Sequence, residues 1–477
     1  MDEQLNRHSR PANPRRRKRT QMQIFKEAYL PVIIAGAAVL LIIIFIIGSI
    51  SRSIQRRNDE REASLAASES AAQALEQLQN EAAALIAEAA PFAAEYDYQS
   101  AIAVLDTFSG DMNQFPNIAA VKEEYVRAQS KLVAWSDPSK ITSLSFQVLI
   151  ADPSRAFVDA NYGSSYNRNF VTTGEFKSIL QQLYENGYML ISLDDFITTE
   201  TTATGAVIYQ NKTVYLPEGK KPLLLTQTQV NYYTYMVDSD NDKLADQGGA
   251  GFANKLILDS NGDITCEMID RNGDTVTGAY DFVPILNAFI DSHPDFSYQG
   301  AKAILAVTGY DGLFGYRTNA EAENYFGKAY HDAQIQAAKE IVTALRSDGY
   351  EIACYTYGNE AYGSISATQI QADLSGWTAE VLSILGDVDI LVYAQQSDIT
   401  ENTVYSGDKY NVLYNAGFRY FLGFCTNGEP WVTVADDYVR IGRLLVSGTS
   451  MAHHSSWFSG IFDPDTVLDS TRGTIPN

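Results

Sequence analysis

Residues Lys221–Tyr233 read K-P-L-L-L-T-Q-T-Q-V-N-Y-Y, and this stretch decides the fold. Three leucines and a threonine follow the proline, a short apolar run typical of a buried strand. Polar residues begin immediately afterwards, at Gln227, Thr228 and Gln229. Because the sites of α/β proteins lie where parallel strands end, the stretch predicts a central strand that leads into a candidate site.

Strand and helix patterns alternate on both sides of this stretch. A helix capped by Thr173 is predicted to lead into a strand at Tyr188–Leu193. Residues Asn254–Tyr280 contain two Asn-Gly turns and predict a β-meander. Repeated strand–helix units predict a barrel-like, mostly parallel sheet. Its further expected strands are Ile141–Ile150, Ala303–Thr308, Tyr350–Tyr355 and Val388–Tyr393.

The stretch Lys221–Tyr233 resembles the first motif of the polysaccharide deacetylases, the NodB-homology fold of carbohydrate esterase family four, which reads roughly T-F-D-D-G. Residues Glu351–Asn359 resemble the second motif, S-H-T-x-x-H, and Phe170–Phe196 matches the helix-turn-strand pattern of the family. The resemblance runs from about Ser136 to the C-terminus. It implies an α/β fold, a distorted (β/α) barrel of NodB-homology type with an inserted β-meander, preceded by a transmembrane helix and a helical stalk and hairpin.

The two motifs lack the side chains that would carry out the chemistry that the resemblance implies. The family's catalytic base corresponds to Thr228, and its three metal ligands correspond to Gln229, Tyr355 and Asn359. Amides and a neutral phenol are poor ligands for a divalent cation, and a threonine hydroxyl is no general base. We therefore expect no metal, no other cofactor and no catalytic residue at these degenerate positions.

The replacing side chains are still polar, and neutral hydrogen-bonding groups with aromatic faces suit sugars. The sequence therefore predicts a binding site for cell-wall or surface glycan. The alternative is that these groups merely bond to one another in an idle pocket. The predicted substrate-binding residues are Gln229, Tyr232, Tyr355, Asn359, Gln395 and Gln396.

Two other functions stay open at this level. The first is an active metal-dependent polysaccharide or peptidoglycan deacetylase with a displaced metal site, for which His453-His454 is the candidate ligand pair. The second is a structural or regulatory partner of an active paralogue. Asp238, Asp240 and Asp242 alternate in a loop but lack the spacing of a calcium-binding loop.

The N-terminal region predicts a membrane anchor. Ala28–Ser51 is an uncharged run of 24 residues, about 36 Å as a helix. The basic cluster Arg15–Arg19 precedes it and predicts a cytoplasmic N-terminus with an extracytoplasmic C-terminal domain, held to the cell membrane by a single pass. A cleaved signal peptide is the alternative. The expected segments are a cytoplasmic tail (1–27), a transmembrane helix (28–51), a helical stalk and hairpin (52–135) and a deacetylase-like domain (136–477).

The net charge and the cysteine content exclude further classes of partner and of fold. The net charge is −23, and residues 1–27 carry eight Lys/Arg against three acids, so residues 28–477 carry −28. An acidic body argues against nucleic acid as a partner. Three cysteines without metal-type spacing predict no disulfide framework. Residues 58–90 have near-heptad apolar spacing, which predicts a solvated stalk or, alternatively, a parallel homodimer.

Overall fold

The computed structural model describes residues 22, 30–135, 137–400 and 404–476. The predicted cytoplasmic tail lies outside these residues apart from Met22. The chain divides into two compact units, residues 1–81 and 82–477, and each is described by itself.

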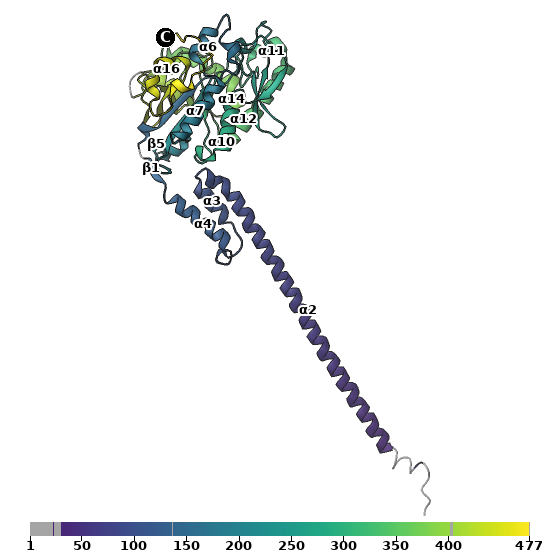
Figure 1. The fold of residues 1–477 in the computed structure, drawn as a ribbon. Helices are drawn as coiled ribbons and strands as arrows, with labels where there is room; N and C mark the ends of the chain where they lie inside the picture. Colours follow the sequence, from purple (N-terminus) through teal and green to yellow (C-terminus); the bar gives the residue numbers. More distant parts are fainter. Residues whose placement is uncertain (1–21, 23–29, 136, 401–403, 477) are drawn as a thin grey trace, which may run out of the picture. The chain divides into compact units, whose positions relative to one another are not determined.

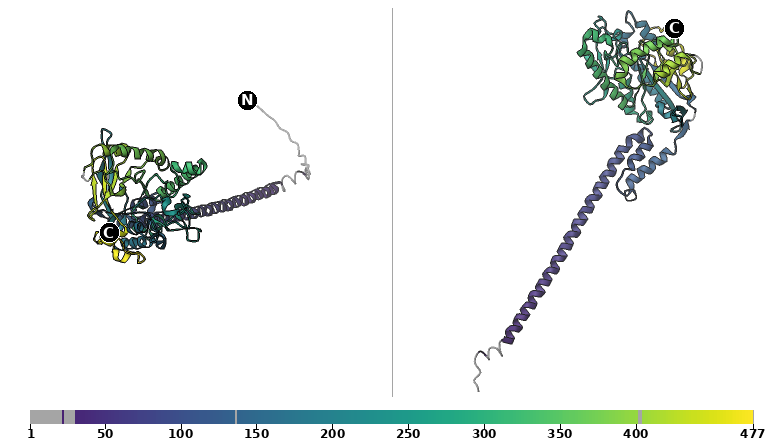
Figure 2. Two further views of the ribbon diagram at one scale, coloured as in Figure 1. Left: turned by 90° about the horizontal axis from the view of Figure 1, so that it is seen from above. Right: turned by 180° about the vertical axis from the view of Figure 1, so that it is seen from behind.

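The predicted transmembrane segment and stalk belong to a single helix, α2 (Leu30–Ala94), which Figure 2 shows without a break. Its apolar part is long and hydrophobic enough to cross a membrane, with a mean hydropathy of 3.2 and none of it buried. Alanine, glutamate and glutamine continue the helix beyond that part because they are good helix formers. Leu65 and Leu75 in the heptad-like part are 57% and 50% exposed.

A helical hairpin follows, formed by α3 (Tyr98–Leu105) and α4 (Pro116–Gln129). The Asp97 carboxylate caps α3 by accepting a hydrogen bond from the Ser100 amide at 3.0 Å. The sequence analysis expected this region to be helical as far as Trp135, and that was wrong at its end. Residues 133–135 form strand β1 (Val133–Trp135), which pairs with β6 (Val214–Leu216). This pairing gives the backbone N–H and C=O groups of both strands hydrogen-bond partners.

Seven parallel strands close into a barrel in residues 82–477, as the sequence analysis predicted. Around the barrel the order is β11-β12-β13-β14-β16-β2-β7, and β7 pairs with β11 to close it. Strand β3 (Tyr188–Leu190) pairs with the first half of β7. The barrel strands are β2 (Thr142–Phe146), β7 (Lys221–Thr228), β11 (Ile304–Val307), β12 (Glu351–Cys354), β13 (Ile390–Val392), β14 (Tyr420–Phe424) and β16 (Val439–Leu445).

Alternation along each strand separates the barrel interior from its outer face. Ala353, Val392 and Ile441 belong to the interior cluster. The outer face packs against amphipathic helices, among them α7 (Thr173–Glu185), α10 (Phe282–Ser292) and α12 (Lys328–Ser347) (Figure 1). The other helices of at least six residues are α6 (Gly163–Asn169), α11 (Ala320–Phe326), α13 (Ala367–Gly376), α15 (Asp408–Asn415) and α16 (Gly448–His453).

The inserted β-meander is present as β8 (Lys255–Leu258), β9 (Ile264–Ile269) and β10 (Thr275–Gly278), which are antiparallel. The hairpin of β4 (Ile197–Thr201) and β5 (Val207–Asn211) and strand β15 (Trp431–Val434) were not foreseen.

Two local predictions need correction. Thr172, not Thr173, caps α7, since its hydroxyl accepts from the Glu175 amide at 3.1 Å and the Glu175 carboxylate accepts from the Thr172 amide at 2.7 Å. The strand predicted at Ile141–Ile150 ends at Phe146, because the chain leaves the barrel there.

Candidate functional site

Most of the predicted site residues follow three strands on one side of the barrel. Gln229 follows β7, Tyr355 and Asn359 follow β12, and Gln395 follows β13. The strands are parallel, so these segments meet at one end of the barrel, which we call the barrel mouth. Strand β11 lies between β7 and β12 and contributes Thr308 to the same end.

The backbone of the barrel mouth is unusual. Five non-glycine residues there adopt a left-handed conformation, with φ of 60° at Gln229, 61° at Thr356, 60° at Asn359, 50° at Gln395 and 56° at Gln396. This conformation costs on the order of 1–2 kcal/mol for a residue with a Cβ, and it is rare for β-branched threonine. Strain of this kind gathers at functional sites.

The side chains of the mouth differ in their access to solvent. Gln395 and Gln396 are exposed, Gln229 and Asn359 are partly buried, and Tyr355 is 6% exposed. The Gln395 Nε2 donates to the Asn359 carbonyl at 2.7 Å, which ties the loops after β12 and β13 together. The Asn359 Oδ1 is buried and has no hydrogen-bond partner in the described chain. A free buried acceptor of this kind is a group that a ligand can satisfy.

Tyr232 is not where the sequence analysis placed it. The residue is 1% exposed and belongs to the core outside the barrel. Its hydroxyl donates to Asp281 Oδ2 at 2.6 Å, and Gln227 and the Leu149 amide donate to the same carboxylate at 2.8 and 2.7 Å. Burial raises the pKa of Asp281. Tyr232 is therefore part of a buried structural network and cannot touch a sugar at the mouth.

A different set of tyrosines leads from the mouth to the surface, and we call it the tyrosine row: Tyr162, Tyr233, Tyr235 and Tyr310. The Tyr233 hydroxyl bonds to the Thr308 hydroxyl at 2.9 Å. Its ring stacks on Tyr310 and Tyr235, with centroids 5.2 and 5.8 Å apart, and Tyr162 lies 5.1 Å from Tyr235. Tyr162, Tyr235 and Tyr310 are 43%, 41% and 38% exposed. The pattern Y-Y-T-Y at 232–235 could have indicated these tyrosines from the sequence, but only the structure shows which of the rings are exposed.

The residues of the mouth do not fit the divalent metal that the family resemblance implies. Gln229, Tyr355 and Asn359 offer no carboxylate or imidazole. The Thr228 hydroxyl is 1% exposed and donates to the Phe146 carbonyl at 3.2 Å, so it is held in a backbone contact. A buried guanidinium, that of Arg443, also lies among the inward-facing residues, and a cation there disfavours a second cation.

Arg443 is a residue that sequence reasoning missed. Its Nη1 donates to the Ser145 hydroxyl at 2.6 Å and its Nη2 to the Tyr393 carbonyl at 2.9 Å. Its guanidinium lies over the Phe424 ring, 4.1 Å from the centroid. The signal was an arginine inside the apolar run V-R-I-G-R-L-L-V at 439–446, a pattern that fits an inward-facing cation in a strand.

The proposed displaced ligand pair, His453-His454, is not assembled as a metal site. The His453 Nε2 bonds to the Ile475 carbonyl at 2.9 Å, and the His454 ring stacks on Trp457 at 4.2 Å. In the described ranges, one group of acids has ligand atoms close enough for a common ion: Asp238, Asp240 and Asp246. The carboxylates of Asp238 and Asp246 already accept amide hydrogen bonds of their own loop, which is sufficient reason for the cluster.

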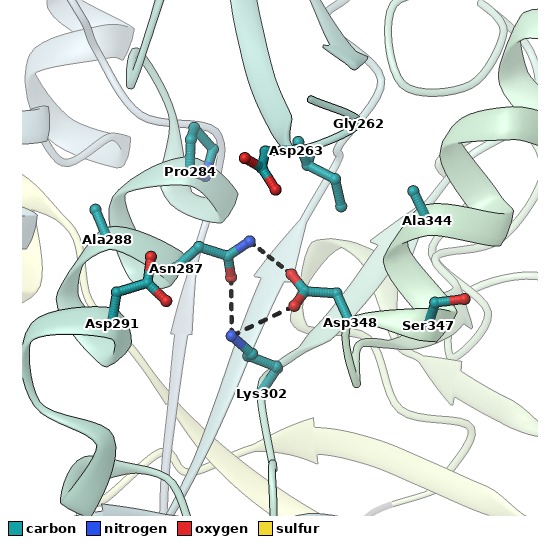
Figure 3. Close-up of a pocket in the computed structure, with 11 residues that line it drawn as sticks. Gly262, Asp263, Pro284, Asn287, Ala288, Asp291, Lys302, Ala344, Ser347 and Asp348 are labelled. Carbon is teal, nitrogen blue, oxygen red and sulfur yellow. Dashed lines mark hydrogen bonds and ion pairs between the residues drawn. The ribbon is translucent and has the colours of Figure 1, made fainter. Parts of the chain in front are cut away.

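A cavity of about 460 Å³ lies at the opposite end of the barrel, where Lys302 and Asp348 precede β11 and β12 (Figure 3). Three of its polar side chains, Asn287, Lys302 and Asp348, bond to one another. The Asn287 amide donates to Asp348 at 2.6 Å, and Lys302 donates to Asn287 at 3.2 Å and lies 3.6 Å from Asp348. The cavity has no connection with the predicted site residues.

Comparison with known proteins found similar solved structures at low sequence identity. No protein-family model and no curated protein matches the sequence. Among solved structures, the Streptococcus pyogenes deacetylase PplD in complex with acetate is similar over 72% of this chain and all of its own, at 12% identity and a TM-score of 0.34. The de-N-acetylase from Aggregatibacter actinomycetemcomitans is similar over 68% of this chain and 99% of its own, at 9% identity and a TM-score of 0.35.

The fold that the resemblance to the polysaccharide deacetylases implied is confirmed by the structure itself, whose parallel strands close into a barrel. The low identities and TM-scores add nothing on activity or ligands.

Proposed function

We propose that this chain is a membrane-anchored, extracytoplasmic, deacetylase-like protein that has no catalytic activity and binds cell-envelope glycan at the barrel mouth. The observation that carries the proposal is the strained backbone at Gln229, Thr356, Asn359, Gln395 and Gln396. The family's metal chemistry does not account for this strain, because the ligand side chains are replaced. A retained binding role does, since strained loops hold side chains in the positions that a ligand needs.

The chemistry of the mouth supports a sugar as the ligand. Its polar groups are neutral amides and hydroxyls, which can both donate and accept, and the exposed rings of Tyr235 and Tyr310 stand beside it. Sugars present hydroxyl groups on their edges and C–H groups on their faces, so amides and aromatic rings together match them. Tyr232 is excluded from the proposed set by its burial.

Calorimetry with peptidoglycan and chitin fragments tests the binding. The full chain in detergent should bind with a Kd on the order of 0.1–1 mM, which corresponds to about 4–5.5 kcal/mol. Tyr355→Ala should abolish measurable heat. Tyr215→Ala removes an exposed tyrosine from β6 and serves as the matched control. No heat with the unmodified protein, or equal heat with Tyr355→Ala, would contradict the proposal.

Metal analysis tests the loss of catalysis. The purified chain should hold well under one zinc per molecule after dialysis and should not deacetylate acetylated glycans. The combined variant Gln229→Asp, Tyr355→His and Asn359→His should gain zinc, because it restores the anionic and imidazole ligands. Stoichiometric zinc in the unmodified chain that disappears on His453→Ala and His454→Ala would instead establish the displaced metal site.

Protease treatment of cells without a wall tests the membrane topology. The apolar part of α2 and the preceding basic residues predict that protease digests the chain after Arg57 and spares the N-terminal tail. Protection of residues 82–477 in intact cells would refute an extracytoplasmic domain. A shortened mature N-terminus would identify the apolar stretch as a signal peptide.

A further inference from the structure

Arg443 carries a buried positive charge without an anionic partner. It is 1% exposed and belongs to the inward-facing residues of β16, two positions beyond Ile441. Its hydrogen bonds go to a hydroxyl and a carbonyl, both of them neutral. In the part of the chain that the structure describes, no carboxylate lies within ion-pair distance of it. Burial lowers the pKa of Arg443 to about 10, so the side chain is still charged at neutral pH.

Other polar atoms around the guanidinium are also left without partners. The Arg443 Nε, the Thr226 hydroxyl and the Ser143 hydroxyl are buried and make no hydrogen bond within the described ranges. Thr226 pairs in register with Ser145, which itself accepts from Arg443, so these groups lie on adjoining strands. A buried, uncompensated charge is costly unless an anion or a network of dipoles stabilises it. The Phe424 ring compensates only part of the charge.

Tyr355 connects this charge with the mouth. Both residues lie at the mouth end of the barrel: Tyr355 follows the last residue of β12 and belongs to the interior cluster, and Arg443 pairs in register with Phe424, the last residue of β14. A neutral phenol hydroxyl has a proton that it can donate to an anion. Strand β13, the neighbour of β12, leads into the exposed residues Gln395 and Gln396. The same end of the barrel therefore offers an anion a hydroxyl donor and a fixed positive charge.

We propose that the glycan bound at the mouth carries a carboxylate, that the Tyr355 hydroxyl donates to this carboxylate, and that Arg443 is the positioning residue whose charge makes the site prefer it. The inference rests on the proposed glycan binding and names the class of sugar, a uronic acid or another sugar with a single carboxylate. Charge-assisted hydrogen bonds to carboxylates are about twice as strong as neutral ones. The acidic body of the chain, −28 over residues 28–477, opposes densely charged polymers, so an isolated carboxylate fits better.

Two pairs of sugars test the preference, because the members of each pair differ by a carboxylate-bearing group. Calorimetry compares glucuronate with glucose, and N-acetylmuramic acid with N-acetylglucosamine, on the full chain in detergent. The acidic member of each pair should bind at least tenfold tighter. Tyr355→Phe removes one oxygen and should bring this ratio close to one while leaving weak binding of the neutral sugars. Arg443→Met should do the same, and Arg443→Lys should keep part of the preference.

A matched control removes an arginine from the other end of the barrel. Arg419 immediately precedes β14 and stacks on Tyr414, so Arg419→Met should leave the preference unchanged. Should Arg443→Met fail to fold, Tyr355→Phe decides alone. Equal binding of acidic and neutral sugars by the unmodified chain would overturn this inference and leave the proposed glycan binding standing. Binding of neither sugar, nor of longer fragments, would overturn both. An unchanged ratio in Tyr355→Phe would also overturn the inference.

Discussion

Replacing Glu351 with glutamine tests how a buried carboxyl group at the end of the barrel opposite the mouth affects stability. Glu351 begins β12 and precedes the inward-facing residues Ala353 and Tyr355 by two and four positions, so its side chain faces the same way. Burial, together with the nearby carboxylates of Asp194 and Asp389, raises its pKa from 4.5 to about 8. At neutral pH the folded protein therefore retains a proton on Glu351 that the unfolded chain has released.

The sign and the size of the effect follow from this difference. Because the folded state binds more protons between pH 4.5 and about 8, the free energy of unfolding falls as pH rises through this window. At about 1.4 kcal/mol per pKa unit, the ionisable side chain costs about 3 kcal/mol of stability at pH 7 and about 5 kcal/mol at pH 9. Both are upper limits, since solvent reaches part of the residue. Glutamine has nearly the same shape and cannot ionise, so Glu351→Gln should recover this stability.

The assay is urea unfolding of the full chain in detergent at pH 4, 7 and 9, followed by tryptophan fluorescence. All four tryptophans lie after residue 81, so the signal reports on the unit that contains Glu351. The variant should match the unmodified protein at pH 4 and exceed it increasingly at pH 7 and 9. Glu218→Gln, at an exposed position, should have no such pH dependence. A stability difference that is constant from pH 4 to 9, or a variant less stable at pH 9, would refute the reasoning.

Three further substitutions test other parts of the structure by the same unfolding assay. Arg472→Ala breaks a buried ion pair with Glu175, whose atoms are 2.6 Å apart, and should cost about 3–5 kcal/mol because it leaves a buried carboxylate unpaired; a loss below 1 kcal/mol would contradict this. Thr172→Ala removes the cap of α7 and should cost about 1 kcal/mol. Gln396→Gly relieves left-handed strain at an exposed position and should raise stability by about 0.5–1 kcal/mol while weakening glycan binding. A more stable variant with unchanged binding would show that the strained backbone does not serve binding.

Local patterns in the sequence predicted the barrel and most of its parts. The apolar run at Lys221–Thr228 became a strand that is buried from Pro222 onward, because both of its faces are covered. The Asn-Gly turns became the tight turns of the meander, since glycine accepts the positive φ of 90° and 83° at Gly262 and Gly273. The uninterrupted apolar and alanine-rich segments became the one helix α2.

Tertiary structure alone decided which polar residues belong to the site. Tyr232 and Tyr233 are neighbours in sequence, yet one joins a buried network with Asp281 and the other reaches the row of tyrosines beside the mouth. Arg443 lies 298 positions from its partner Ser145, and only the closure of the barrel brings them together. A pattern of residue types determines which segments form strands and helices, because those are set by nearby residues. The partners of a buried charge come from distant strands, so its surroundings are determined only when the chain has folded.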